Sequence, residues 1–143
     1  MSIEPGPPEH GADGESPIRQ GSSPAVQGHG LKGGELNAAI TSALVGIHTE
    51  YLGRGPRRAS TFHYGQVIVT LMHDVLTPAE RSLTRANQTD AVDHIRHLFQ
   101  GTMEADFREA IERLTGRKVL AFIGGNHIDP DVAAELFILD SPL

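Results

Sequence analysis

The chain has 143 residues and no cysteine, which excludes disulfides, thiol nucleophiles and thiolate metal sites. Its net charge of −6 at pH 7 does not favour non-specific binding to nucleic acid, and no apolar run is long enough to span a bilayer. We therefore expect a cytoplasmic protein that neither binds nucleic acid nor inserts into a membrane.

Residues 1–34 differ in composition from the rest of the chain. They hold eight of the sixteen Gly residues, five of the nine Pro residues and no aromatic residue. Isolated apolar side chains cannot offset the entropy of ordering such a segment. The sequence therefore predicts a disordered Gly/Pro-rich arm over residues 1–34 and a single domain over residues 35–143.

The first predicted element of the domain is an amphipathic helix from Glu35 to Tyr51, in which apolar residues recur at three- and four-residue steps. Gly53 suits a C-terminal cap. Residues 58–64 and 66–73 follow as two strands of a hairpin. Apolar residues occupy both faces of the second strand, which favours a central place in a sheet.

The strongest local signal is the segment Thr77-Pro78-Ala79-Glu80. Thr77 can cap a helix, Pro78 is pre-set for its first position, and Glu80 lies where a capping-box partner belongs. A short helix to about Arg85 is predicted.

A long helix then begins at Asn87 or Thr89 and ends at Gly116, and Gly101 interrupts its apolar stripe. Strands are predicted over residues 119–123 and 134–139, and the Gly124–His127 segment is interpreted as a bulge or a wide hairpin loop. The order of elements predicts an α+β fold: a four-stranded antiparallel sheet from two hairpins, with the long helix packed on one face.

Four segments resemble, in their order and spacing, a bacterial family formerly known only as a domain of unknown function and now named after MpsC. They are Gly53–Pro56, Val67–Val69, Leu76–Glu80 and Ile111–Val119. The resemblance covers about residues 35–140, which is the whole predicted domain.

This resemblance implies the role of a small soluble component in a cation-linked system that generates a membrane potential. Its expected partners are a membrane subunit, like those of proton-pumping complexes, and a large zinc-containing subunit. Related pairs of such subunits are associated with uptake of dissolved inorganic carbon.

A turn rich in arginine follows the first helix. Arg54, Arg57 and Arg58 place three positive charges around Gly55, whose backbone is accessible. Such a turn could bind a small anion or an acidic loop of a partner. The alternative is a solvated turn whose cations complement the C-terminal dipole of the helix.

Histidines on the long helix form a second candidate site. His94 and His97 are three residues apart, and Asp90 lies one turn earlier. With His63 or His73 from the hairpin, these side chains could bind a metal ion. A solvated helix face explains the same pattern.

The last loop contains His127, Asp129 and Asp131, which could form an acid–base group. A single loop cannot preorganise such a group alone, and no nucleophile motif is present. We therefore predict no catalytic residue and no cofactor.

The long helix also suggests self-association. A domain of this size leaves apolar surface uncovered, so we predict a homodimer joined through the long helix or the sheet, with Ile95, Phe99 and Met103 at the interface. The alternative is that these three residues fill the core of the monomer.

Two functions remain open from the sequence. The first is a non-enzymatic accessory or regulatory protein that docks on a larger membrane-linked assembly for cation or inorganic-carbon transport. The alternative is a small-anion-binding or metal-dependent sensor or catalytic domain.

Overall fold

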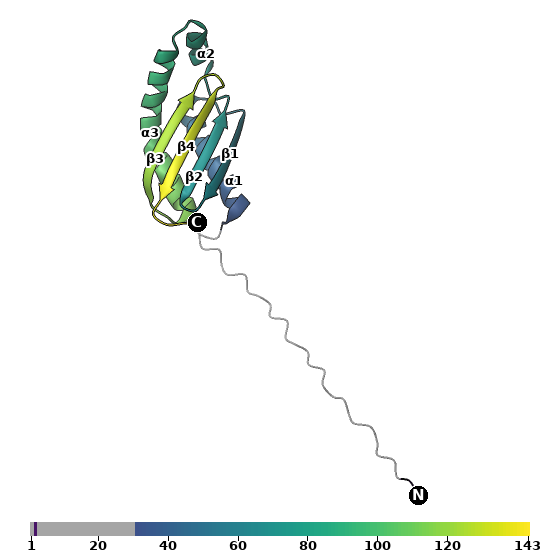
Figure 1. Cartoon of the computed structure of the whole chain (residues 1–143). Coiled ribbons are helices and arrows are strands. Elements are labelled where there is room, and N and C mark those ends of the chain that lie inside the picture. Colours follow the sequence, from purple (N-terminus) through teal and green to yellow (C-terminus); the bar gives the residue numbers. More distant parts are fainter. Residues whose placement is uncertain (1, 3–30) are drawn as a thin grey trace.

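A computed structural model describes residue 2 and residues 31–143 of the chain. The predicted arm therefore lies almost entirely outside the described residues. In chain order, the elements are α1 (Gly33–Leu52), β1 (Arg58–Tyr64), β2 (Val67–His73), α2 (Pro78–Arg85), α3 (Thr89–Thr115), β3 (Val119–His127) and β4 (Val132–Leu139) (Figure 1).

The four strands form one antiparallel sheet in the order β1-β2-β4-β3. Helices α1 and α3 cover one face, with α1 against β1 and α3 against β3 (Figure 1). No helix of the described residues covers the opposite face. This confirms the predicted α+β fold, and the central place of β2 in the sheet is also confirmed.

The helix ends follow the sequence signals closely. Gly53 adopts a left-handed conformation (φ 76°), and its N–H donates to the carbonyl of Thr49 at 2.8 Å. At the start of α2, the Thr77 hydroxyl accepts from the Glu80 N–H at 3.2 Å, and Glu80 accepts from the Thr77 N–H at 2.9 Å. The predicted capping box is therefore confirmed.

The prediction for the second hairpin was wrong in its details. Strand β3 continues through Gly124 and Gly125 to His127, and the register shift lies earlier, between Val119 and Ala121. The two glycines pair with Glu135 and Ala134 of β4. Pairing with β4 thus outweighs the low strand propensity of glycine.

The core has two hydrophobic clusters on the helix-covered face of the sheet. The larger includes Ile40, Phe107 and Phe137, and the smaller is formed by Met72, Val75 and Ala133. Between them runs one polar row across the four strands, in the register Thr61–Thr70–Glu135–Gly124. A buried polar row of this kind requires internal hydrogen bonds.

Candidate functional site

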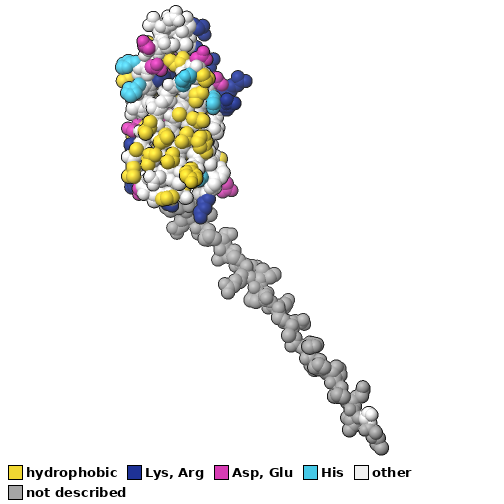
Figure 2. All heavy atoms as spheres, viewed as in Figure 1, with side chains coloured by type: hydrophobic (Ala, Val, Ile, Leu, Met, Phe, Trp, Pro, Cys, Tyr) yellow, Lys and Arg dark blue, Asp and Glu magenta, His cyan; other side chains and the backbone are white. Residues whose placement is uncertain are grey.

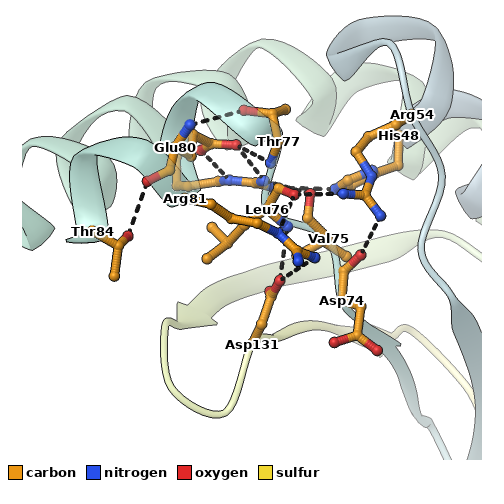
Figure 3. A network of polar contacts seen from close by, with 11 residues as sticks. His48, Arg54, Asp74, Val75, Leu76, Thr77, Glu80, Arg81, Thr84 and Asp131 are labelled. Carbon is orange, nitrogen blue, oxygen red and sulfur yellow. Dashed lines mark hydrogen bonds and ion pairs between the residues drawn. The ribbon is translucent and has the colours of Figure 1, made fainter.

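A buried ion pair joins α2 and α3. The Arg96 guanidinium donates to both carboxylate oxygens of Glu80, each at 2.6 Å, and to the Val75 carbonyl at 2.7 Å. Arg96 is 3% exposed and Glu80 6% exposed. Because the pair is bidentate and Arg96 also bonds to the segment before α2, it fixes how the two helices meet. Figure 3 shows Glu80 and Val75 in this network.

His48 of α1 completes this network. Its Nε2 lies 3.4 Å from Nη1 of Arg96, and because a guanidinium can only donate, Nε2 accepts and Nδ1 carries the proton. Nδ1 is buried and has no hydrogen-bond partner within residues 31–143. Burial is the main cause that lowers the pKa of His48 to about 4, and the positive charge of Arg96 lowers it further. The backbone of Arg54 opposes this decrease only in part.

The arginine turn is divided between two environments. The Arg54 guanidinium donates to the carbonyls of Leu76 at 2.8 Å and Asp74 at 3.2 Å, so it holds the connection between β2 and α2 (Figure 3). Arg57 and Arg58 are exposed. The Arg58 guanidinium lies 3.5 Å from Nδ1 of His73.

Gly55 lies against α1. A Cβ atom at this position would lie 2.9 Å from the Thr49 hydroxyl, so the turn packs closely on the helix. Of its three arginines, Arg54 bonds to backbone carbonyls and Arg57 and Arg58 are exposed, and the anion or partner site at this turn stays a prediction.

The loop candidates for acid–base chemistry have separate structural contacts. Asp131 accepts from the Leu76 N–H at 2.9 Å, and His127 lies 2.8 Å from the carbonyl of Pro130. Oδ1 of Asp131 is buried without a partner in the described part of the chain. A cavity of about 440 Å³ beside it is lined by Asp131, Asp129 and Arg81, among others.

The histidines of α3 lie on its exposed side. Asp90, His94 and His97 are all exposed. His63 instead faces α1, where its Nδ1 lies 2.7 Å from Oδ1 of Asn37. Within residues 31–143, no three His, Asp or Glu side chains are grouped so that they could hold a metal ion.

The residues predicted for a dimer interface differ in exposure. Met103 is 3% exposed and belongs to the main core, whereas Phe99 is 36% exposed and Ile95 is half-buried. Ile95 and Phe99 line a hollow of about 190 Å³ together with Leu98, which is 56% exposed. The homodimer through α3 stays a prediction.

The outer face of the sheet is apolar across all four strands, and we call it the outer sheet face. Figure 2 shows its hydrophobic side chains gathered over the strands. Successive rows of the register, from β1 to β3, are Tyr64–Val67–Ile138–Ala121, Phe62–Val69–Leu136–Ile123, Ser60–Leu71–Ala134–Gly125 and Arg58–His73–Val132–His127.

This face exposes large side chains at both edges of the sheet. Tyr64 is 90% exposed and Phe62 51% exposed on β1, and Ile123 is 62% exposed on β3. The first three rows contain no charged residue, and the fourth adds Arg58 and two histidines. A contiguous exposed apolar surface of this kind marks an interaction site.

Sequence reasoning missed the buried polar residues Arg96, Gln100 and Glu135. A signal was present for two of them, because Arg96 and Gln100 interrupt the apolar stripe of α3 between Val92 and Met103. A charged residue within such a stripe indicates a buried partner.

The comparisons with known proteins give one match. The sequence model of the MpsC family, described as "Na+-translocating membrane potential-generating system (MpsC)", matches residues 32–141. No curated protein and no solved structure matches the chain. Among the described residues, no helix is both long enough and apolar enough to cross a membrane.

Proposed function

Because the chain belongs to the MpsC family, we propose that it is a non-enzymatic accessory subunit that docks on a larger protein of a Na⁺-translocating, membrane potential-generating system. The finer expectations form part of this proposal: a cytoplasmic location, a membrane subunit and a zinc-containing subunit as partners, and a link to inorganic-carbon uptake. The observation that carries it is the outer sheet face.

The composition of the outer sheet face supports a protein partner. Its first three rows expose Phe62, Tyr64 and Ile123 without any charged neighbour in the same rows. Aromatic and aliphatic side chains free of charge are typical of the centre of a protein interface. A larger subunit that covers this face would turn the two-layer domain into a three-layer one.

The size of the outer sheet face favours a larger subunit over a second copy of this chain. The face is four strands wide, at about 4.8 Å a strand, and seven residues long, at about 3.4 Å a residue. Its flat footprint is therefore roughly 450 Å². Two copies stacked through this face alone would share a footprint of about 450 Å² each, at the small end for stable interfaces, which bury roughly 1,200 Å² or more of accessible surface in total. A larger subunit can also contact the sheet edges and so reach that area.

Charge at one end of the outer sheet face indicates what the partner carries there. Arg58, His73 and His127 share the last row, and no acidic residue faces outward in the four rows. We expect an apolar partner surface with acidic side chains along one border.

The proposal is tested by co-purification with the larger subunits of the same system. Phe62→Asp places a charge on the β1 side of the outer sheet face and is expected to weaken binding at least about tenfold. Leu98→Asp on α3 is the matched control, since Leu98 is 56% exposed and Phe62 51% exposed. Unchanged binding of a folded Phe62→Asp variant would contradict the proposal.

Two further measurements test whether a membrane surface or a second copy of this chain covers this face instead. Flotation of the protein with lipid vesicles, lost in Phe62→Asp, would assign the face to a membrane surface. Sedimentation as a dimer that Phe62→Asp dissociates would assign it to a second copy. A dimer dissociated by Leu98→Asp would support the interface predicted on α3 and leave the outer sheet face to the larger subunit.

The alternative of an anion- or metal-dependent domain has less support. Arg54 bonds to backbone carbonyls, and residues 31–143 contain no group of side chains suited to a metal ion. No observation in the described residues favours it over docking.

A further inference from the structure

Strand β3 forms one edge of the sheet, and α3 lies beside it along the same side of the domain (Figure 1). The nine residues Val119–His127 include no lysine, arginine, aspartate, glutamate or proline. The other edge strand, β1, begins with Arg58. Proteins protect exposed edge strands with charges, proline or a covering element, so an edge without charge or proline is a template for pairing with another strand.

The backbone of β3 has free hydrogen-bonding groups on its outer side. Along an antiparallel strand, successive residues direct their N–H and C=O groups alternately to one side and to the other. Leu139 of β4 donates to the Gln66 carbonyl on the β2 side at 2.8 Å. Its neighbour Ile138 therefore bonds to β3, where it pairs with Ala121. The alternation leaves three residues of β3 whose N–H and C=O groups point away from the sheet. They are Phe122, Gly124 and Asn126. Within residues 31–143, these outward groups form no hydrogen bond.

Helix α3 closes this edge only at its start, where the Arg108 guanidinium donates to the Val119 carbonyl at 3.1 Å. Farther along, a hollow of about 310 Å³ lies between α3 and β3. Its lining includes His97, Gly101 and Glu104 of α3 with Phe122 and Gly124 of β3. A Cβ atom at Gly101 would meet nothing within 4 Å, so the helix surface beside the free edge is open.

The side of α3 that faces this edge carries a self-complementary pattern of charges. Three- and four-residue steps place five residues on this side of the helix: Asp93, His97, Gly101, Glu104 and Arg108. Two antiparallel copies of α3 centred beside Gly101 would place Asp93 opposite Arg108 of the other copy. His97 would lie opposite Glu104 of the other copy, where its ring can donate a hydrogen bond to the carboxylate. Glu104 and Arg108 lie 3.5 Å apart within one chain, and both side chains stay partly exposed, so both can contact a second copy.

The free edge of β3 has the same centre as the pattern on α3. Gly124 is the middle one of the three residues with outward backbone groups, so an antiparallel copy of β3 would pair Gly124 with itself. Phe122 would then pair with Asn126 of the other copy. Gly124 also lies at the level of Gln100, since a Cβ atom at Gly124 would lie 1.9 Å from the Gln100 amide nitrogen. Because Gln100 is next to Gly101, one two-fold axis can relate both the strands and the helices.

The dimensions of the two layers fit such a pair. Two helices cover four strands, so each helix takes up the width of two strands, about 10 Å. If the sheet continues across the axis at the same spacing, the two α3 helices also lie about 10 Å apart, which is an ordinary distance between packed helices. Glycine is unfavourable inside a helix, but Gly101 lies beside the axis, where the lack of a side chain lets the helices approach.

We propose that two copies of this chain associate through the β3 edge, with their β3 strands antiparallel and their α3 helices side by side about a two-fold axis. The four strands of each copy then form one continuous sheet. This surface differs from the side of α3 that contains Ile95 and Phe99, where the sequence predicts the interface. The association does not depend on the proposed docking function, but it places the two outer sheet faces next to one another.

The first test is sedimentation of the full chain over a range of concentrations. The wild type is expected to form a species of twice the 15.4 kDa chain mass. Asn126→Pro removes one outward N–H from each copy, and proline is tolerated in an edge strand where the N–H points away from the sheet. Because both symmetric hydrogen bonds are lost, the dissociation constant of the dimer is expected to rise at least about tenfold. Asn126→Thr keeps the N–H, so it is the matched control and should stay a dimer.

Cross-linking tests the geometry without weakening the fold, because the chain has no cysteine of its own. Gly101→Cys lies beside the axis and is expected to form a disulfide between two copies under mild oxidation. Thr102→Cys, one position along, is the matched control. Thr102 lines the other hollow, with Ile95 and Phe99, so this variant is expected to stay unlinked.

A monomeric wild type, or an unchanged dissociation constant in Asn126→Pro, would overturn the proposal. A disulfide in Thr102→Cys instead of Gly101→Cys would overturn it by assigning the dimer to the surface around Ile95 and Phe99. A monomeric wild type whose binding to a larger subunit is lost in Asn126→Pro would overturn it by assigning the edge to a strand of that subunit. Phe62→Asp should remain a dimer, so failure of the docking function is distinguished from failure of this interface.

Discussion

Glu80 and Glu135 are both buried, at 6% and 2% exposure, yet their surroundings favour opposite charge states. Burial would raise the pKa of Glu80, but hydrogen bonds from Arg96 and Thr77 lower it below its usual value. Burial raises the pKa of Glu135 to about 8, since its partner is a neutral amide. The two sites show how strongly the partner of a buried carboxyl group affects whether that group is ionised.

The two carboxyl groups also differ in how their hydrogen bonds are satisfied. Glu80 is satisfied within the fold by Arg96, by the Thr77 N–H and by its place in α2. Glu135 has one neutral partner, Gln100, whose amide nitrogen lies only 1.9 Å from where a Cβ atom at Gly124 would lie. A buried carboxyl group with a countercharge is held ionised, whereas one with a neutral partner stays protonated to higher pH.

The largest expected effect on stability comes from breaking the ion pair between Glu80 and Arg96. Arg96→Met leaves Glu80 buried without its countercharge, so we expect the free energy of unfolding to fall by about 3–5 kcal/mol. Chemical denaturation at neutral pH measures it. The double variant Arg96→Met/Glu80→Leu should recover most of the loss, because neither charge then remains. A single variant as stable as the wild type would show that the pair does not hold α2 to α3.

The next effect is a dependence of the free energy of unfolding on pH, and it comes from Glu135, which has no countercharge. An unfolded glutamate ionises near 4.5, whereas folded Glu135 ionises near pH 8. Its stabilising contribution is therefore complete below 4.5 and is lost as pH rises through about 8, at up to about 1.4 kcal/mol per pH unit. Glu135→Gln removes this slope, so its stability relative to the wild type should rise between about pH 5 and pH 9.

His48 provides an internal control for that measurement. Its pKa is lowered to about 4, so its contribution is present above 6.5 and is lost as pH falls through about 4. Between about pH 7 and pH 8, His48 is largely neutral in both the folded and the unfolded state, so a fall in the free energy of unfolding over this range should come mainly from Glu135. A wild-type curve that is flat over this range would contradict the buried, uncompensated state of Glu135.

A smaller effect is expected at the start of α2. Thr77→Ala removes the hydroxyl that accepts from the Glu80 N–H, while the Arg96 pair and the Thr77 N–H contact stay in place. We expect a loss of about 1 kcal/mol in the free energy of unfolding, measured by chemical denaturation. Thr77→Ser keeps the hydroxyl and is the control. A loss as large as that of Arg96→Met would show that the cap and the ion pair are one unit.

The comparison of Glu80 with Glu135 also explains which features could be predicted from the sequence. Thr77, Pro78 and Glu80 lie within four residues, so the capping box could be predicted from local chemistry. The pairing of Glu80 with Arg96 joins residues 16 positions apart on different helices and depends on how those helices dock. Local patterns contain no information on that docking.

The surroundings of Glu135 could not be predicted from local patterns either, because they depend on strand pairing. Gly124 and Gly125 indicated a loop, and only their pairing with β4 places Gly124 opposite the buried Glu135. Met103 illustrates a related limit, because the periodicity of α3 identifies an apolar stripe but not whether it contacts the core or a partner.

The smallest expected effect is a gain in stability at Gly101. Alanine is about 1 kcal/mol better than glycine inside a helix, and a Cβ atom at Gly101 meets nothing within 4 Å. Gly101→Ala should therefore raise the free energy of unfolding by up to about 1 kcal/mol, measured by thermal or chemical denaturation. Gly124→Ala is the contrasting variant, and it should destabilise the fold, because its Cβ atom would lie 1.9 Å from Gln100. A loss of stability at Gly101 would instead mean that α3 itself needs glycine there.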